Sequence, residues 1–525
     1  MHPATALPER FNFAQHLLQQ NAQRADKIAY IDDTCSLRYG ELDERIRRFA
    51  AGLLAIGMRR EERVLLLMHD TVDMPVAFLG AMFAGVIPVP INTLLPAADV
   101  GYMIRHSRAR AVVVSASQLS TVQEALNSNG DDRRRELPQL IVSGAQPGDA
   151  SGLTSMADLL ATEPLAPDDA ADTCADDFAF WLYSSGSTGR QKGTVHSHAN
   201  LFWSAELYGK PILGLRSDDT VFSAAKLFFA YGLGNSLTFP LSVGATVVLM
   251  AERPTPQAVF QRLVEHKPSI FCCVPTLFVA MLASDARPAP DQVAIRRCAS
   301  AGEALPRQVG EKFSALYGCE ILDGLGSTEM THIFMSNQSG NVRYGTSGVA
   351  VPGYEVELRD DDDQPVGPGE IGNLYVRGPS AALLYWTNRE KSRTTFVGEW
   401  VNTGDKYTKD ADGFYTYSGR SDDMLKVSGQ YVSPIEVESA LIEHEAVLEC
   451  AVIGKADANG LTKTVAYVVL GDARRASPQL VEELQTHTKA RLSPHKYPRE
   501  IVFVPDLPKT ATGKIQRYKL RAQFG

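Results

Sequence analysis

Tyr183-Ser-Ser-Gly-Ser-Thr-Gly-Arg-Gln-Lys-Gly193 is the stretch around which the rest of the sequence is arranged, and it follows the apolar run Phe178–Leu182. Its glycines let a backbone approach an anion closely, its serine and threonine hydroxyls can donate hydrogen bonds, and Arg190 and Lys192 add positive charge. The spacing is not that of a Walker loop, because Lys192 precedes a glycine. The stretch predicts a phosphate-binding loop; the alternative is a flexible surface turn, which such compositions also mark.

Length and composition indicate a multidomain globular protein. The 525 residues suggest roughly three or four compact units at about 150 residues each. The hydrophobic content is 44% and the net charge is −9, which argues against a nucleic-acid surface. Met1–Arg10 lacks the pattern of a signal peptide, and prolines interrupt the longest apolar stretch, Val76–Ile91. We therefore expect a cytoplasmic protein without a membrane span.

Metal-binding patterns are weak in this sequence. The seven cysteines are scattered without Cys-x-x-Cys spacing, so we expect reduced thiols that mostly fill the core, and no zinc site. His196 and His198 form a His-x-His pair, but no further ligands lie nearby in the sequence.

Helical and strand patterns alternate through the first part of the chain. Phe13–Asn21 and Leu42–Ile56 have helical periodicity, whereas Arg63–Met68 and Ala111–Val114 are short apolar runs typical of buried strands. This alternation predicts an α/β fold with a parallel sheet. Gly85–Ile91 is expected to be an edge strand because it contains two prolines.

Later segments predict three further parts. Residues 127–176 are rich in Gly, Asp, Pro and Arg, which is typical of surface connections. The alternation resumes over residues 201–274 and predicts a second sheet. Short strands and turns over 341–419 predict a small antiparallel β unit, and residues 420–525 predict a separate α+β unit with a helix that begins at the capping box Ser433–Glu436.

Three polar stretches stand where a core would not tolerate them. Asp323–Glu329 lacks the third glycine of a dinucleotide fingerprint, but its Thr328 and Glu329 could bind phosphate and Mg²⁺. Trp400–Asp405 predicts a tight turn whose acid could accept hydrogen bonds from ribose, with a simple capped turn as the alternative. Tyr417–Gly429 joins the β unit to the last unit, a position in which a linker is the usual interpretation.

Together these stretches resemble the adenylate-forming superfamily, which includes acyl-CoA synthetases, peptide synthetase adenylation domains and firefly luciferase. The phosphate loop, the Ser-Thr-Glu element, the Thr-Gly-Asp element, the Gly-Arg-x-Asp hinge and a terminal Gly-Lys occur in the family's order. The resemblance implies an N-terminal domain over 1–419, with two α/β sheet subdomains and a small antiparallel β subdomain. It also implies a mobile α+β C-terminal domain over 420–525, with a hinge near 420–423 at Asp422.

The resemblance also implies the roles of individual residues. Joining a carboxylate to the α-phosphate of ATP brings two anions together, so the site must neutralise both. Lys514 would bridge these two groups, Glu329 would assist Mg²⁺, and Lys426 with Gly429 would face CoA during thioester formation. The residues implied to contact ATP are Ser184, Ser185, Gly186, Ser187, Thr188, Gly189 and Lys192 at the phosphates, Gly302, Glu303, Ala304, Asp323, Gly324 and Leu325 at adenine, Thr328, and Asp405 and Arg420 at the ribose.

The acyl site resembles that of benzoate-CoA ligases. The residues that carry this resemblance are Phe229, Ala230, Tyr231, Ala301, Gly302, Gly326, His332 and Ile333. It implies ATP-dependent activation of benzoate to benzoyl-AMP and then to benzoyl-CoA, for degradation of aromatic acids. Another cyclic acid such as 2-aminobenzoate, a carrier-protein-loading enzyme and a catalytically silent nucleotide-binding regulator remain alternatives. The resemblance further implies that acetylation of Lys514 would block adenylation, because it removes the charge.

Overall fold

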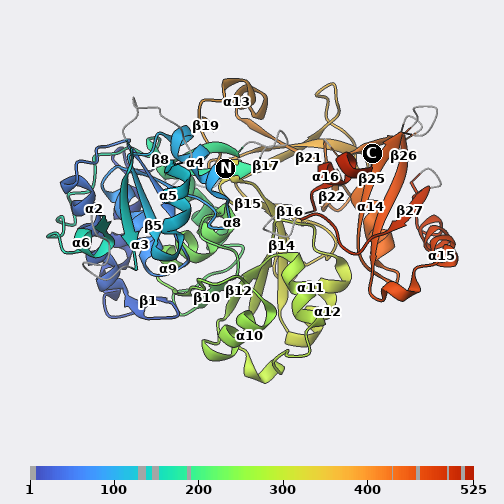
Figure 1. Cartoon of the computed structure of the whole chain (residues 1–525), viewed down its shortest axis with the longest axis horizontal. Helices are drawn as coiled ribbons and strands as arrows, with labels where there is room; N and C mark the ends of the chain where they lie inside the picture. The colour runs from blue at the N-terminus through green and yellow to red at the C-terminus, as the bar shows by residue number, and fades with distance from the viewer. Residues whose placement is uncertain are drawn as a thin grey trace. The chain divides into compact units, whose positions relative to one another are not determined.

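The chain is described by a computed structural model over residues 7–127, 137–144, 153–185, 191–421, 423–427, 430–456, 462–492, 496–509 and 515–524. It divides into two compact units (Figure 1). The first comprises residues 1–344, 348–355 and 376–401, and the second comprises residues 345–347, 356–375 and 402–525. The division of the sequence at 419/420 into an N-terminal and a C-terminal domain stays a prediction.

A nine-stranded sheet forms the centre of the first unit, and its inner strands are parallel. Antiparallel pairs occur only toward its two edges among the pairings described. In order across the sheet the strands are β16 (Val349–Ala350), β15 (Ile333–Ser336), β14 (Glu320–Gly326), β13 (Arg297–Ser300), β12 (Ile270–Cys273), β10 (Thr220–Ser223), β11 (Thr246–Val248), β1 (Ile28–Ile31) and β2 (Ser36–Arg38).

Helices α10 (Pro256–Glu265), α11 (Pro275–Ala283) and α12 (Arg307–Tyr317) lie along this sheet (Figure 1). Their buried side chains, among them Phe260, Phe278 and Phe313, form one cluster with Phe222 and Phe271 from the strands. The predicted second α/β sheet is therefore confirmed, and it brings the carboxyl ends of β10, β12, β13 and β14 to one edge, where ligand sites of open α/β sheets form.

A second sheet of the first unit has five parallel strands: β4 (Ile87–Pro90), β3 (Arg63–Leu67), β5 (Ala111–Ser115), β6 (Gln139–Ser143) and β7 (Thr154–Ser155). The predicted edge position of the proline-containing strand β4 is confirmed. The prediction that residues 127–176 are surface connections is wrong in part, because β6 lies within them. Its residues Ile141 and Val142 are buried, and the polar flanks concealed this short apolar run.

The predicted phosphate loop Tyr183–Gly193 begins within strand β8 (Phe178–Ser185) and ends within β9 (Gln191–Ser197), and the two strands pair antiparallel. The loop prediction is therefore too long at both ends, and residues 186–190 lie outside the described residues. Strand β19 (Leu384–Tyr385) completes this three-stranded sheet. Other helices of the first unit are α1 (Phe13–Asn21), α2 (Tyr39–Ala55), α3 (Asp73–Phe83), α4 (Ala97–Ser107), α5 (Leu119–Asn127), α6 (Met156–Leu160), α7 (His198–Ser204), α8 (Ala230–Leu233), α9 (Phe239–Val243) and α13 (Arg389–Thr395).

The antiparallel β unit is confirmed as a small sheet of β17 (Glu355–Arg359), β18 (Ile371–Arg377), β21 (Trp400–Lys409), β20 (Phe396–Val397) and β22 (Tyr415–Arg420). The last part of the chain contains the hairpin β23 (Leu425–Val427) and β24 (Gln430–Val432), and the sheet β25 (Val447–Ala456), β26 (Thr462–Leu470) and β27 (Glu500–Phe503). Its helices are α14 (Pro434–Ile442), α15 (Pro478–Lys489) and α16 (Arg517–Phe524).

Five cysteines, at positions 272, 273, 298, 319 and 450, are buried and free, as expected of core residues, whereas Cys35 and Cys174 are exposed. None of the helices in the described ranges combines the length and the apolar character that a membrane crossing needs. Within the same ranges, no group of three or more His, Cys, Asp or Glu side chains is arranged to hold a metal ion.

The N-terminus of α14 offers a test of the local structure. Ser433 Oγ accepts a hydrogen bond from the amide of Glu436 at 3.2 Å. Removing a serine N-cap costs about 1 kcal/mol, so Ser433→Ala should speed hydrogen exchange in peptides from α14 roughly fivefold. The exposed residue Gln479 in α15 is the control: Gln479→Ala should leave exchange unchanged, and equal rates in both variants would contradict the assignment of the cap.

Candidate active site

The carboxylate of Glu329 is held by two hydroxyl groups in the first unit. Its Oε1 accepts a hydrogen bond from Tyr385 at 2.7 Å and one from Ser184 at 3.3 Å. Lys192 donates from Nζ to the Tyr385 hydroxyl at 3.3 Å, and its ammonium lies 4.4 Å from the centre of the Tyr385 ring. Three predicted residues, Ser184, Lys192 and Glu329, therefore lie together where β8 ends and β9 begins.

Tyr385 is a site residue that the sequence analysis missed. It pairs with Thr194 in the β19–β9 ladder, and this pairing places its side chain beside Lys192. The backbone amide of the next residue, Trp386, also bonds to the carbonyl of Gly193 at 2.8 Å. The only sign of this segment in the sequence is the adjacent aromatic pair Tyr385 and Trp386, and such pairs usually belong to the hydrophobic core.

The residues after Glu329 make an unusual backbone turn. Thr331 has φ 67° and ψ −43°, and the amide of His332 bonds to the carbonyl of Met330 at 2.7 Å. These dihedrals and the three-residue hydrogen bond define a γ-turn of the rare kind with positive φ, which is strained, especially for a β-branched residue. Strain of this type costs on the order of 1–3 kcal/mol and persists where surrounding contacts enforce it.

Buried hydrogen bonds enforce this γ-turn. The Thr331 hydroxyl donates to the carbonyl of Ser380 at 2.8 Å, and Ser380 Oγ donates to the carbonyl of Met330 at 2.8 Å. His196 Nδ1 lies 3.2 Å from the Thr331 oxygen; because the hydroxyl proton is already given to Ser380, the imidazole is the donor. Burial lowers the pKa of His196 to about 4, so this side chain is neutral. His196 thus supports the turn.

His332, on the other side of the turn, lies among aromatic rings. Its ring centre is 4.5 Å from that of Phe239 and 5.4 Å from those of Tyr208 and Tyr231. Nε2 bonds to the carbonyl of Tyr231 at 3.1 Å, and burial lowers the pKa of His332 to about 3. A neutral imidazole at neutral pH results, so His332 helps to form an uncharged aromatic surface.

The predicted acyl residues Gly326 and Ile333 are paired across the β14–β15 ladder. A Cβ on Gly326 would lie 2.7 Å from the backbone of His332, so only glycine permits this close approach. Ile333 is buried, whereas Phe229, Ala230 and Tyr231 at the start of α8 are half-buried. The carbonyl of Tyr231 accepts the His332 bond, so these two predicted groups lie side by side.

The predicted adenine segments also come together. Ser300, the last residue of β13, pairs with Asp323 of β14, and Ala301, Gly302, Glu303 and Ala304 follow directly. Glu303 accepts a hydrogen bond from the Thr276 hydroxyl at 2.6 Å, and Gly302 is exposed with φ 95°. Asp323 is buried, and burial raises its pKa to about 8, so its carboxyl group is protonated at neutral pH. Gly324 and Leu325 continue β14, and Thr328 begins the short helical turn Thr328–Met330.

The predicted ribose pair lies in the second unit. Asp405 and Arg420 are paired across β21 and β22, and Arg420 Nη1 lies 2.9 Å from Asp405 Oδ1. The predicted tight turn at Trp400–Asp405 is wrong, because these residues belong to the continuous strand β21. Gly404 takes φ 71° within that strand, so the local irregularity is a distortion of the strand rather than a chain reversal.

Several predicted residues lie outside the described residues: Gly186, Ser187, Thr188, Gly189, Asp422, Gly429 and Lys514, together with the side chains of Ser185 and Lys426. Their predicted roles stay predictions.

Comparison with known proteins identifies the family. The protein-family model described as AMP-binding enzyme matches residues 17–386. The family model described as AMP-binding enzyme C-terminal domain matches residues 436–514. The chain belongs to the AMP-binding enzyme family. The AMP-binding family assignment agrees with the predicted adenylate-forming architecture.

Similar proteins span almost the whole chain. A benzoate-CoA ligase of Thauera aromatica is 53% identical over 99% of this chain and 97% of its own length. A solved benzoate CoA ligase from Burkholderia xenovorans LB400 is 59% identical, with a TM-score of 0.89 over 97% of this chain and 100% of that one. A solved anthranilate CoA ligase, AuaEII, in complex with anthranoyl-AMP, is 40% identical, with a TM-score of 0.91 over 98% of each chain.

Tyr385→Phe tests the Glu329 group. The substitution removes the hydroxyl that bonds to Glu329 and Lys192, and a hydrogen bond to a charged group is worth about 1.5–3 kcal/mol. We expect the KM for MgATP in ATP–pyrophosphate exchange to rise about tenfold, which corresponds to about 1.4 kcal/mol. Tyr317→Phe, which removes a hydroxyl bonded to the carbonyl of Pro288, is the control. Unchanged MgATP dependence in Tyr385→Phe would contradict this role.

The raised pKa of Asp323 predicts that the stability of the folded protein depends on pH. The folded protein keeps a proton on this carboxyl up to about pH 8, whereas the unfolded chain releases it near an ordinary pKa of about 3.9. Its contribution to stability therefore falls as the pH rises between these values. Asp323→Asn cannot titrate, so its Tm relative to the unsubstituted protein should rise by a few degrees from pH 5 to pH 8.5. A difference independent of pH would exclude this assignment.

Proposed function

We propose that the chain is an AMP-forming benzoate-CoA ligase. It converts benzoate and ATP to benzoyl-AMP and pyrophosphate, and then transfers the benzoyl group to CoA with release of AMP. The observation that carries the proposal is the γ-turn at Thr331, which joins the charged group around Glu329 to the neutral aromatic surface at His332. A phosphate-binding region and a ring-binding region thus adjoin within four residues.

Electrostatics supports the first half-reaction. Benzoate and the ATP triphosphate are both anions, so their approach requires positive charge that is fixed in advance. Lys192 supplies one such charge and is held against Tyr385. In the proposed reaction the loop residues after Ser184 bind the pyrophosphate portion, and Lys514 bridges the carboxylate and α-phosphate oxygens.

Mg²⁺ fits the donors around Glu329. This ion prefers one or two carboxylates together with phosphate oxygens and water, rather than an all-protein cage. Glu329 offers one carboxylate, and its position is fixed by Ser184 and Tyr385. When bound, Mg²⁺ would neutralise phosphate charge, and the hydroxyl of Thr328 would be available to a phosphate oxygen.

The aromatic surface supports a flat ring as the acyl group. His332, Tyr231, Phe239 and Ile333 provide apolar or uncharged surface, and none of them favours a charged tail. The benzoate-CoA ligases among the similar proteins support benzoate as the substrate. His332 Nδ1 is a buried acceptor without a hydrogen-bond partner among the described residues, and an amino group on the ring could donate to it. Together with the similarity to the anthranilate CoA ligase, this acceptor makes 2-aminobenzoate the second candidate substrate.

The second half-reaction belongs to the C-terminal part of the chain. In this proposal the domain over 420–525 rotates about Asp422 after adenylation, which withdraws Lys514 and brings Lys426 and Gly429 toward CoA. Acetylation of Lys514 would remove its charge and stop adenylation. The reaction takes place in the cytoplasm and prepares aromatic acids for degradation.

Pyrophosphate release with a panel of acids tests the substrate. Benzoate, 2-aminobenzoate, cyclohexenecarboxylate, acetate and a long-chain acid are each assayed with and without CoA. We expect benzoate to give the highest kcat/KM and CoA to be required for turnover. A higher kcat/KM with 2-aminobenzoate would reassign the acid, and adenylate that CoA does not discharge would point to a carrier protein as acceptor.

Lys514→Ala tests the first half-reaction separately. Loss of one preorganised charge in a closed site should slow adenylation by about 10²–10³, while conversion of added benzoyl-AMP to the thioester continues. Lys509→Ala is the matched control, because this nearby lysine pairs with Glu449 instead. Equal adenylation rates in the two variants would refute the role of Lys514, and the same comparison applies to Lys514 acetylated in vitro.

A further inference from the structure

The segment Lys226–Gly234, here called the acyl loop, is held in place by residues that have no role in the proposed reaction. Asp70 is buried and follows strand β3 of the five-stranded sheet, yet its carboxylate accepts the amide of Leu227, at 3.3 Å from Oδ1 and 3.1 Å from Oδ2. Leu227 belongs to the loop that follows β10 of the other sheet. A carboxylate from one sheet therefore holds the loop of the other.

Lys226 anchors the same loop on its second side. Its ammonium donates to the carbonyl of Met250 and, at 2.7 Å, to that of Glu252, both just beyond strand β11. Its charge also acts on Asp70 and opposes the rise in pKa that burial imposes on that carboxyl, which leaves the pKa at about 6. A buried carboxylate and a half-buried ammonium thus stabilise each other beside the first residues of the acyl loop.

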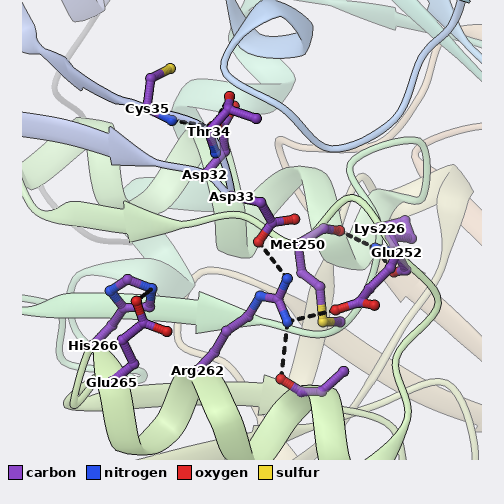
Figure 2. Close-up of polar contacts among 11 residues, drawn as sticks. Asp32, Asp33, Thr34, Cys35, Lys226, Met250, Glu252, Arg262, Glu265 and His266 are labelled. Atoms are coloured by element: carbon purple, nitrogen blue, oxygen red, sulfur yellow. Dashed lines mark hydrogen bonds and ion pairs between the residues drawn. The ribbon is translucent and has the colours of Figure 1, made fainter.

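An ion network lies beside the Lys226 anchor (Figure 2). The Arg262 side chain is only 7% exposed and points between two acids, with Nη1 2.8 Å from Glu252 and Nη2 2.5 Å from Asp33. Glu252 is the residue whose carbonyl receives Lys226. The preceding acid, Asp32, accepts the amide of Val72 at 2.9 Å, two residues after Asp70. The turn between β1 and β2 therefore restrains both Asp70 and Lys226.

The backbone transmits this anchoring to the acyl site. The carbonyl of Lys226 accepts the amide of Phe229 at 3.0 Å, and a Cβ on Gly232 would lie 2.0 Å from that same carbonyl oxygen. The loop is therefore wound tightly against its first residue. Its carbonyl at Tyr231 then accepts the bond from His332. A displacement of Lys226 or Leu227 would move Phe229, Ala230 and Tyr231 together.

We propose that Asp70 and Lys226 are positioning residues that set the acyl loop for the aromatic acid, a role that rests on the proposed function. Neither residue contacts the reacting atoms. In this proposal the Asp70 carboxylate acts in its ionised form. The charged groups that act on Lys226 besides Asp70 are Arg262, Asp33 and Glu252, and the neighbouring His69 has a pKa lowered by burial and by Lys226.

The test compares Asp70→Asn and Lys226→Met with the control Asp219→Asn. Asp219 is an equally buried acid of the first unit, but it pairs with Arg296 and bonds to Ser269 away from the acyl loop. Asp70→Asn keeps an oxygen that can accept the amide of Leu227 but removes the negative charge, whereas Lys226→Met removes the hydrogen bonds of the ammonium. Each variant weakens a charge-assisted hydrogen bond, so we expect both to raise the KM for the aromatic acid about tenfold, with the KM for ATP within about twofold of its original value. Lys226→Arg should restore most of the affinity for the acid.

Hydrogen exchange of the ligand-free protein gives a second readout that does not depend on the substrate. Peptides covering residues 226–234 should exchange faster in Asp70→Asn and Lys226→Met, but not in Asp219→Asn. Unchanged exchange in this segment, or an equal rise of the KM for ATP and for the acid, would overturn the proposal. If the unsubstituted enzyme prefers an acid other than benzoate, the proposed substrate is wrong. The hydrogen-exchange rates of residues 226–234 still decide whether Asp70 positions the acyl loop.

Discussion

The γ-turn centred on Thr331 is the constraint on which the site depends. A residue with a β-branched side chain and φ 67° is unfavourable by itself, and it is retained because Ser380 and His196 bond to its hydroxyl in a buried environment. The turn reverses the chain between Glu329 and His332, so that Glu329 bonds to Ser184 and Tyr385 whereas His332 lies among aromatic rings.

Charge and neutrality are separated across this turn. On one side, Glu329, Ser184, Tyr385 and Lys192 form a group of fixed charges and hydroxyls suited to phosphate and a divalent cation. On the other side, burial keeps His332 neutral among Tyr208, Tyr231 and Phe239. In the proposed reaction, the phosphate groups would lie on the Glu329 side of the turn and the ring of the acid on the His332 side, an orientation that suits the attack of a carboxylate on a phosphate.

The sequence was sufficient to predict the elements whose pattern lies within a few neighbouring residues. Apolar β-branched runs gave the inner strands, two prolines gave the edge position of β4, and Ser433 gave the start of α14. Contacts between distant segments were not readable: Tyr385 meets Glu329 from 56 residues away, and Asp70 meets Leu227 from 157 residues away. Strand β6 was missed because polar residues surround its short apolar core, and Gly404 suggested a turn where the strand only distorts.

The most direct test of the account is a crystal structure with a non-hydrolysable analogue of benzoyl-AMP. We expect the ring to contact Tyr231, His332 and Ile333, and the phosphate to lie on the Glu329 side of the γ-turn, toward Ser184 and Lys192. A ring bound away from His332, or a phosphate on the same side of the turn as the ring, would contradict it.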